Sequence, residues 1–343
     1  MKTVKYLAAA AMLLAAGCGE DKEATTGAVA LAPRIAAGTT IAFYGNDSAV
    51  ADDPALKELN DKLEAQAAEG DKAILDAIKE SGLQDVEWSV ATIGEITRPA
   101  DDAEGIALPK IAVVAKAKGV FAIDGIVALV KENLAEGGYG MRIEEATVKG
   151  LKAYKVELDD RADIPNLAPV IGTAADGKAI IFAVNKESFA AAYENAIEGK
   201  GAEAPAFAGL TDLPEGSFYR LRIPGAGALV QSLAKEEELA LAGELPDGTP
   251  IADIIKGAGD LQVDCFLKDG RIAVRATVAL ADEATTQNLA ALATAGLMFV
   301  KGSAAQAGKV AADAASSITV KAEGSTLAAE VSMSIQLVIE ELE

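Results

Sequence analysis

The sequence predicts an α+β protein built from two similar halves, each a mostly antiparallel sheet with helices packed on one face. Short stretches of alternating apolar residues mark strands, and stretches with apolar residues at helical spacing lie between them. Tight turns at Lys149-Gly150, Asp269-Gly270 and Glu323-Gly324 each join two strand patterns, which is typical of antiparallel hairpins. The order of elements also repeats once along the chain, which indicates two halves of similar construction.

The first half is expected at residues 41–198. It opens with the strand pattern Ile41–Tyr44, and Asp53 followed by Pro54 suits the cap and first turn of a helix. Alternating apolar residues predict the next strand at about 85–96. Further strands are expected at 110–118, 141–148, 151–158 and 179–184, and helices at 122–134 and 187–197, whereas residues 159–176 are expected to be irregular.

A small, charged stretch with a proline at 199–206 is expected to link the halves, and the second half follows at 207–343. Its strands are expected at 217–223, 260–267, 271–280, 318–321 and 326–333, and its helical segments at about 226–256, 282–315 and the end of the chain. The apolar run 289–300 is about twelve residues long, which is too short to cross a membrane as a helix. We therefore expect this run to form a buried helix.

Both halves share one order of elements: strand, helix, two strands, helix, two strands. The first half adds a further strand and helix at 179–197. The order repeats better than the residues do, which favours an old internal duplication.

The composition excludes several function classes. The net charge of −21 repels phosphate backbones, so nucleic acid is not expected as a partner, and it also disfavours electrostatic docking on anionic lipid. The chain has no histidine, which removes the commonest general base, the usual catalytic triads and most zinc sites. No cofactor is expected either, because Gly225-Ala226-Gly227 is followed by Val230 where the dinucleotide pattern has a third glycine.

Ser232 and Lys235 form the best catalytic candidate, since they match S-x-x-K and one turn of helix places both side chains on one face. The companion motifs S-D-N and K-T-G are missing, so a polar helix surface is the favoured interpretation. The acid pairs Asp101-Asp102 and Asp159-Asp160 are candidates for a metal site or a carboxylate pair. No calcium-loop pattern surrounds them, which favours solvated turns.

Cys265 lies in phase with the apolar residues of its predicted strand. A small buried hydrophobic residue is the favoured interpretation, and a reactive thiol is the alternative.

The first eighteen residues have the layout of an export signal, with Lys2 and Lys5 before the apolar run Tyr6–Ala16. The ending Leu14-Ala15-Ala16-Gly17-Cys18 resembles the lipobox of bacterial lipoproteins, with Ala15 where that class usually has Leu. The resemblance covers residues 1–19 and implies removal of the signal peptide 1–17 and acyl chains on Cys18. Residues 19–40 mix acidic residues, threonine, glycine and alanine with Pro33, so we expect a lipidated tether at 18–40. Gly19 stands where inner-membrane lipoproteins often carry Asp, which favours the outer membrane.

These observations lead us to expect a membrane-anchored lipoprotein that faces the periplasm and is held to the membrane through Cys18. We expect it to be non-catalytic and to bind an envelope protein or a small apolar ligand. A hydrolase that uses carboxylates or Ser232 and Lys235 is one alternative, and a structural element of an envelope assembly is another. A binder would show an apolar groove or patch between the halves with few ionisable groups, whereas an enzyme would bring titratable groups together.

Overall fold

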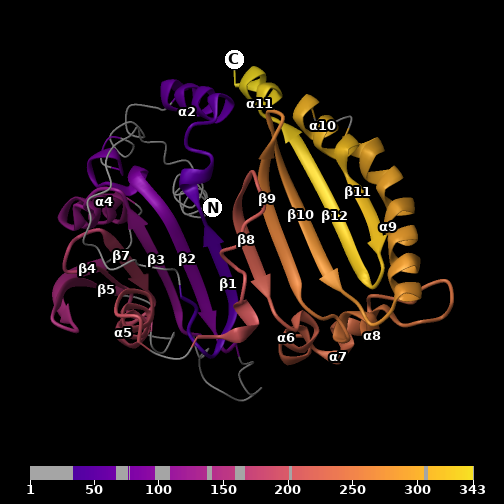
Figure 1. The fold of residues 1–343 in the computed structure, drawn as a ribbon, viewed down its shortest axis with the longest axis horizontal. Coiled ribbons are helices and arrows are strands. Elements are labelled where there is room, and N and C mark those ends of the chain that lie inside the picture. Colours follow the sequence, from indigo (N-terminus) through magenta and orange to yellow (C-terminus); the bar gives the residue numbers. More distant parts are fainter. Residues whose placement is uncertain are drawn as a thin grey trace. The chain divides into compact units, whose positions relative to one another are not determined.

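The computed structural model describes residues 34–66, 76, 78–96, 109–136, 141–158, 167–200, 203–304 and 308–342. The chain divides into two compact units, of which unit 1 comprises residues 1–95 and 99–211, and unit 2 comprises residues 96–98 and 212–343. Both units combine helices with antiparallel strands, which confirms the α+β class. Figure 1 labels the elements.

Unit 1 is organised around a seven-stranded antiparallel sheet in the order β1-β2-β3-β7-β6-β5-β4. Its strands are β1 (Thr39–Gly45), β2 (Val86–Gly94), β3 (Ile111–Ala117), β4 (Met141–Val148), β5 (Leu151–Leu158), β6 (Val170–Thr173) and β7 (Ala179–Ala183). Its helices are α2 (Pro54–Gln66), α4 (Ile123–Glu136) and α5 (Lys186–Ala192), the last continuing into the π-helix η3 (Tyr193–Ile197); short 3₁₀ segments are η1 (Asp47–Ala49), η2 (Leu83–Asp85) and η4 (Pro205–Phe207).

Helices lie on both faces of the unit 1 sheet, whereas one covered face was expected. Ile126 of α4 packs in a core cluster with Ala115 and Ile180 from one face. Phe189 of α5 lies against Gly172 on the opposite face, so closely that a Cβ on this glycine would sit 2.7 Å from the ring. Burial of both faces explains why β7 is an unbroken apolar run, Ala179–Ala183, instead of an alternating one.

Unit 2 has a five-stranded antiparallel sheet in the order β11-β12-β10-β9-β8. Its strands are β8 (Ser217–Ile223), β9 (Leu261–Lys268), β10 (Arg271–Ala279), β11 (Thr319–Glu323) and β12 (Thr326–Ser334). Its helices are α6 (Ala226–Leu233), α7 (Glu236–Ala240), α8 (Ile251–Lys256), α9 (Glu283–Ala304), α10 (Lys309–Ser317) and α11 (Ile335–Glu341). Within the described ranges, no helix is both long and apolar enough to span a membrane.

The two sheets share one topology apart from a single insertion. When the strands of unit 2 are numbered by their order in the sequence, they lie in the sheet, starting from β8, as first, second, third, fifth and fourth. Unit 1 has the same order, with the β6–β7 hairpin placed between its third and fifth strands. Three antiparallel pairings, β3–β7, β7–β6 and β6–β5, separate β3 from β5, so these two strands run in opposite directions. Their counterparts β10 and β12 pair directly and also run in opposite directions. This agreement supports the duplication predicted from the order of elements.

Candidate apolar binding surface

The sheet of unit 2 has one apolar face and one polar face. Successive side chains on a strand point to opposite faces, and residues paired across strands share a face. Val274 of β10 pairs with Cys265 and Val331, whereas its neighbour Arg275 pairs with Asp264 and Glu330. The same alternation extends through the remaining strands. The apolar residues that share a face with Val274, here called the open face, are Tyr219, Leu221, Ile223, Leu261, Val263, Cys265, Leu267, Ile272, Val274, Ala276, Val278, Val320, Ala322, Leu327, Ala329, Val331 and Met333.

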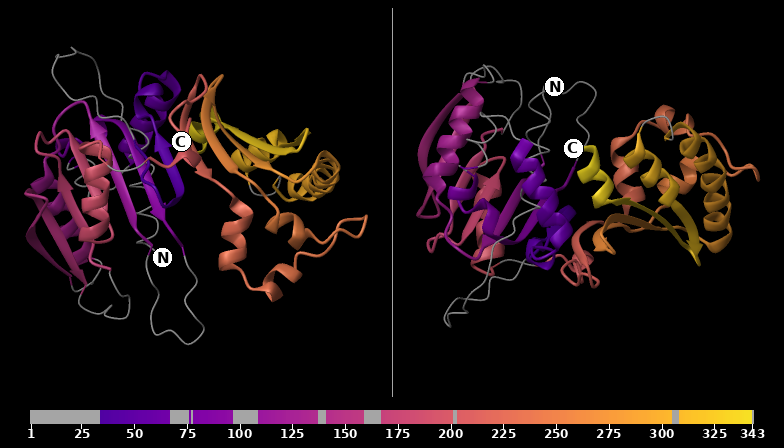
Figure 2. Two further views of the ribbon diagram at one scale, coloured as in Figure 1. Left: turned by 60° about the horizontal axis from the view of Figure 1, so that its bottom comes forward. Right: turned by 90° about the horizontal axis from the view of Figure 1, so that it is seen from above.

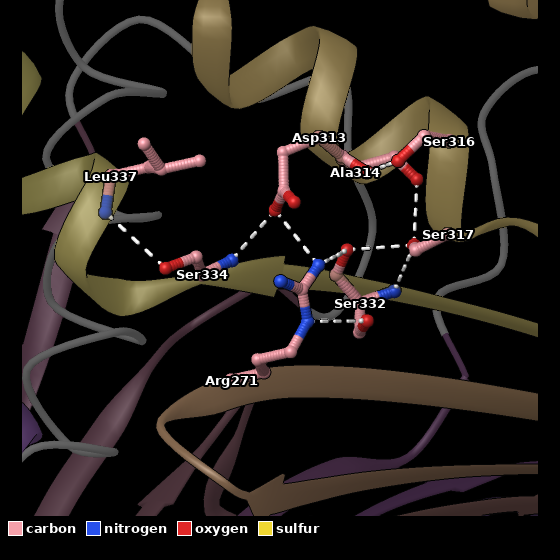
Figure 3. Close-up of polar contacts among 8 residues, drawn as sticks. All are labelled: Arg271, Asp313, Ala314, Ser316, Ser317, Ser332, Ser334 and Leu337. Atoms are coloured by element: carbon pink, nitrogen blue, oxygen red, sulfur yellow. Dashed lines mark hydrogen bonds and ion pairs between the residues drawn. The ribbon is translucent and has the colours of Figure 1, made fainter.

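Helix α10 is held on the polar face by a hydrogen-bonded network (Figure 3). The guanidinium of Arg271 reaches Asp313 of α10 at 2.8 Å and donates to the Ser332 hydroxyl at 3.0 Å. Asp313 also accepts from the backbone N–H of Ser334 at 2.9 Å, and the Ser317 hydroxyl donates to the Ser332 carbonyl at 2.7 Å. The guanidinium and this N–H hold the pKa of Asp313 below its ordinary value. The network therefore fixes α10 over the polar side of the sheet.

No helix of the described part of unit 2 lies across the open face. Figures 1 and 2 show α9, α10 and α11 on the same side of this sheet. Every open-face residue is partly exposed, whereas Ala273 and Ala328 on the polar face are buried. A difference between the two units explains why no helix covers the open face. Helix α5, which covers the second face in unit 1, follows the inserted hairpin, and the described part of unit 2 has neither the hairpin nor this helix.

The open face has the extent of the largest apolar patches on monomeric proteins. Five strands about 4.8 Å apart and about 25 Å long give it an area of roughly 500–600 Å². The largest apolar patch on a typical monomer is about 300–600 Å² and is often functional. The area thus marks this face as a candidate binding surface.

The chemistry of the open face restricts what it can bind. None of its residues carries a charge, and the backbone N–H and C=O groups between the strands are paired in the sheet ladders. Only the Tyr219 hydroxyl and the Cys265 thiol are polar, and burial, with the Asp264 charge second, raises the pKa of that thiol. Cys265 thus lies in phase with its apolar neighbours as predicted, but it is partly exposed and not buried. A ligand on this face gains contact with hydrocarbon and few hydrogen bonds.

The C-terminal half of α9 corrects a second expectation. The apolar run 289–300 was expected to be buried, yet Met298 is 79% and Phe299 83% exposed. Only Thr286 and Ala290 are buried along α9. Within the run only Ala290 is buried and Leu289 and Leu297 are partly exposed, so most of its apolar side chains, the largest included, face outward.

Ser232 and Lys235, the candidate catalytic residues, do not lie on one continuous helix. Helix α6 ends at Leu233, and Lys235 has an extended backbone before α7. The Ser232 hydroxyl donates to the Leu229 carbonyl at 2.7 Å, and the backbone N–H of Lys235 donates to Glu238 at 3.0 Å. Both side chains are exposed.

The other sequence candidates lie outside the described residues: Cys18, Asp101, Asp102, Asp159 and Asp160. Among the residues that the structure describes, no group of three or more acidic or cysteine side chains is placed to hold a metal ion. Each described carboxyl group with a resolved shift has its pKa lowered, as at Asp124, which accepts from Lys152 and Tyr154. A general acid at neutral pH needs the opposite shift.

No protein-family model matches the chain, and no curated protein matches it either. Crystal form III of TP0453 is similar to it at 8% sequence identity and a TM-score of 0.43, covering 89% of this chain and 94% of that one. Crystal form I of TP0453 has 8% identity and a TM-score of 0.40, covering 88% of this chain and 92% of that one. Likeness at this level carries no inference about function.

Proposed function

We propose that this protein is a non-catalytic, lipid-anchored protein of the bacterial cell envelope that binds the hydrocarbon chain of a lipid on the open face of unit 2. The open face is the observation that supports binding. The lipobox-like sequence ending at Cys18 supports the anchor and a position at the outer membrane, facing the periplasm. The two features belong together, since a membrane anchor keeps the binding surface close to a source of lipid.

The size and polarity of the open face suit an acyl chain. A surface without charge or spare hydrogen-bonding groups cannot orient a polar ligand, but it gains free energy from any hydrocarbon that it covers. Each buried CH₂ contributes about 0.8 kcal/mol, so a twelve-carbon chain gains on the order of 9 kcal/mol before the cost of ordering it.

The charge of the protein favours a neutral headgroup on that lipid. The net charge of −21 repels anionic headgroups, so attraction between opposite charges does not assist binding. Membrane attachment then depends on the acyl chains of Cys18. We therefore expect neutral or zwitterionic single-chain lipids to bind better than fatty-acid anions.

A structural role in an envelope assembly is the second candidate, and the exposed end of α9 favours it. Met298 and Phe299 project from the helix together with Val300, which is also exposed. Exposed aromatic and methionine side chains are enriched at protein interfaces. A partner protein that covers this end of α9 would leave the open face available for lipid.

Native mass spectrometry of the protein purified from its own membranes tests the proposal. We expect a mature chain that begins at Cys18 and carries acyl groups, together with a non-covalent lipid that leaves on activation. A Cys18→Ser variant should lose the acyl groups and keep the non-covalent lipid. A chain that starts elsewhere would contradict the anchor, and a lipid-free protein that also fails to take up added monoacylglycerol would contradict the binding function.

A further inference from the structure

Unit 2 has two exposed apolar surfaces in its described part, and they lie on opposite sides of its sheet. One is the open face. The other is the C-terminal half of α9, where the large side chains Leu292, Met298, Phe299 and Val300 are all exposed. Helix α9 packs on β11 and β12 from the polar side, so it cannot reach the open face of its own sheet (Figures 1 and 2). A contact between these two surfaces therefore joins two copies of the chain.

Unit 1 shows which kind of element fits this side of the sheet. Helices α4 and α9 both follow the third strand of their sheets, so the face opposite α4 in unit 1 corresponds to the open face. In unit 1 that face carries α5, whose Phe189 ring is fully buried against Gly172. The C-terminal half of α9 offers the same combination, an apolar helix with an aromatic ring at its surface.

The C-terminal half of α9 is uncharged and held in place. No charged residue lies between Glu283 and Lys301. The Lys301 ammonium donates to the Ser316 carbonyl of α10 at 3.2 Å, which keeps this end of the helix beside α10. The run 289–300 is about 18 Å long, and the strands of the open face are about 25 Å long. The helix end therefore fits within the open face and brings no charge from this run onto it.

The size and the charge of the protein limit how tightly two copies can associate. The open face can bury at most roughly 500–600 Å² on each copy, or about 1,000–1,200 Å² in total, which is just below the range of stable complexes. The net charge of −21 on each copy also opposes association, although neither apolar surface is charged. Salt screens this repulsion, so a weak and reversible association should strengthen as the salt concentration rises.

We propose that unit 2 binds a second copy of this chain by docking the exposed end of α9 onto the open face of that copy. Phe299 then packs over Val274 and Val331 at the centre of the face. Because the two surfaces differ, a pair of copies leaves one α9 and one open face free, and further copies add in the same orientation. The docking uses the open face but does not require that lipid binds there.

Sedimentation velocity over a range of protein and salt concentrations tests the proposal. The full chain is used in its Cys18→Ser form, so that no acyl chain drives association and all variants share one background. Phe299→Ser removes the ring from α9 and should weaken self-association about tenfold or more. Leu241→Ser is the matched control, because this side chain is 87% exposed and lies on neither surface. Equal loss of association in both variants, or none in either, would overturn the proposal.

A second variant, which alters the other surface, distinguishes this docking from a symmetric contact. The double variant Val274→Thr with Val331→Thr alters the open face and keeps α9, whereas Phe299→Ser keeps the open face. Each variant alone should stay monomeric at concentrations where the unmodified chain associates, and their mixture should form one-to-one pairs. If the double variant associates alone, two α9 helices form the contact; if Phe299→Ser associates alone, two open faces form it. Either result would overturn the proposal.

An unmodified chain that stays monomeric at high protein and salt concentrations would overturn it as well, including the case in which Phe299 instead mediates binding to neutral phospholipid vesicles. Lipid binding on the open face is measured separately by titration. Self-association can therefore fail while the proposed function stands, and the reverse.

Discussion

Replacing Val274 and Val331 together by threonine tests directly whether the open face binds hydrocarbon. The two residues are cross-strand partners on β10 and β12, at the centre of that face. Threonine keeps the β-branched shape and adds one hydroxyl. An acyl chain over the pair removes both hydroxyls from water without offering a hydrogen bond, at a cost of about 1–3 kcal/mol each. We therefore expect at least about 2 kcal/mol in total, which corresponds to roughly 30-fold weaker binding.

The free protein should tolerate this double substitution. Both valines are partly exposed, so the hydroxyls stay in contact with water and the free energy of unfolding should fall by less than about 1 kcal/mol. Isothermal titration with monododecanoylglycerol below its aggregation threshold gives the affinity, and urea unfolding gives the stability. Val113→Thr changes a partly exposed strand valine in unit 1 and serves as the control. Unchanged lipid affinity in a stably folded double variant would refute the reasoning.

Three further predictions concern other parts of unit 2. Asp313→Asn removes the ion pair with Arg271 and should lower the free energy of unfolding by about 1–2 kcal/mol at neutral pH. Since folding lowers the pKa of Asp313, the stabilisation is present above the ordinary Asp pKa and is lost as the pH falls through the pKa of the folded state. The free energies of unfolding of the two proteins, measured with urea, should therefore converge in acid. A difference that stays constant with pH would refute this prediction. Gly227→Ala places a Cβ 2.3 Å from the Lys256 carbonyl oxygen and should lower the melting temperature, whereas an unchanged value would exclude this close contact. Phe299→Ser should leave the free energy of unfolding within about 0.5 kcal/mol of the original because the ring is exposed, and should reduce any self-association seen by sedimentation; a large loss of stability would show that the ring is packed.

The hairpins were predictable because their signals are local. At Asp269-Gly270 and Lys149-Gly150, both central residues have positive φ, which two-residue hairpin turns of this type require. Asp and Gly adopt this conformation at low cost, and the flanking alternation fixes which residues face each other. The turn and the strand pattern therefore agree, and the strands β9 and β10 follow the prediction closely.

The elements that sequence reasoning missed depend on tertiary context. Strand β6 has only four residues, one of them Gly172, so it has too little alternation to be recognised within the stretch expected to be irregular. Its stability comes from pairing with β5 and β7 and from Phe189 packed on the glycine. Likewise, the apolar run in α9 indicated a partner for that helix, but a run of apolar residues does not reveal whether the fold supplies one.

The open face could be predicted only in part. The alternation in β10 and β12 already gives each strand one apolar face, and the register follows from the hairpin turn. Whether a helix covers that face depends on the number and placement of helices in the whole unit. The absence of a counterpart to α5 becomes informative only once the two sheet orders are compared.

Alkylation of Cys265 is the most direct test of binding on the open face. In a Cys18→Ser variant it is the sole cysteine of the chain, and its thiol lies on the open face between Val274 and the strand β8. The raised pKa of this thiol calls for measurement at mildly alkaline pH, where enough thiolate is present. If the lipid covers the open face, saturating monododecanoylglycerol slows the alkylation of Cys265. An alkylation rate that is unchanged while the lipid is bound would place the lipid elsewhere and contradict the account.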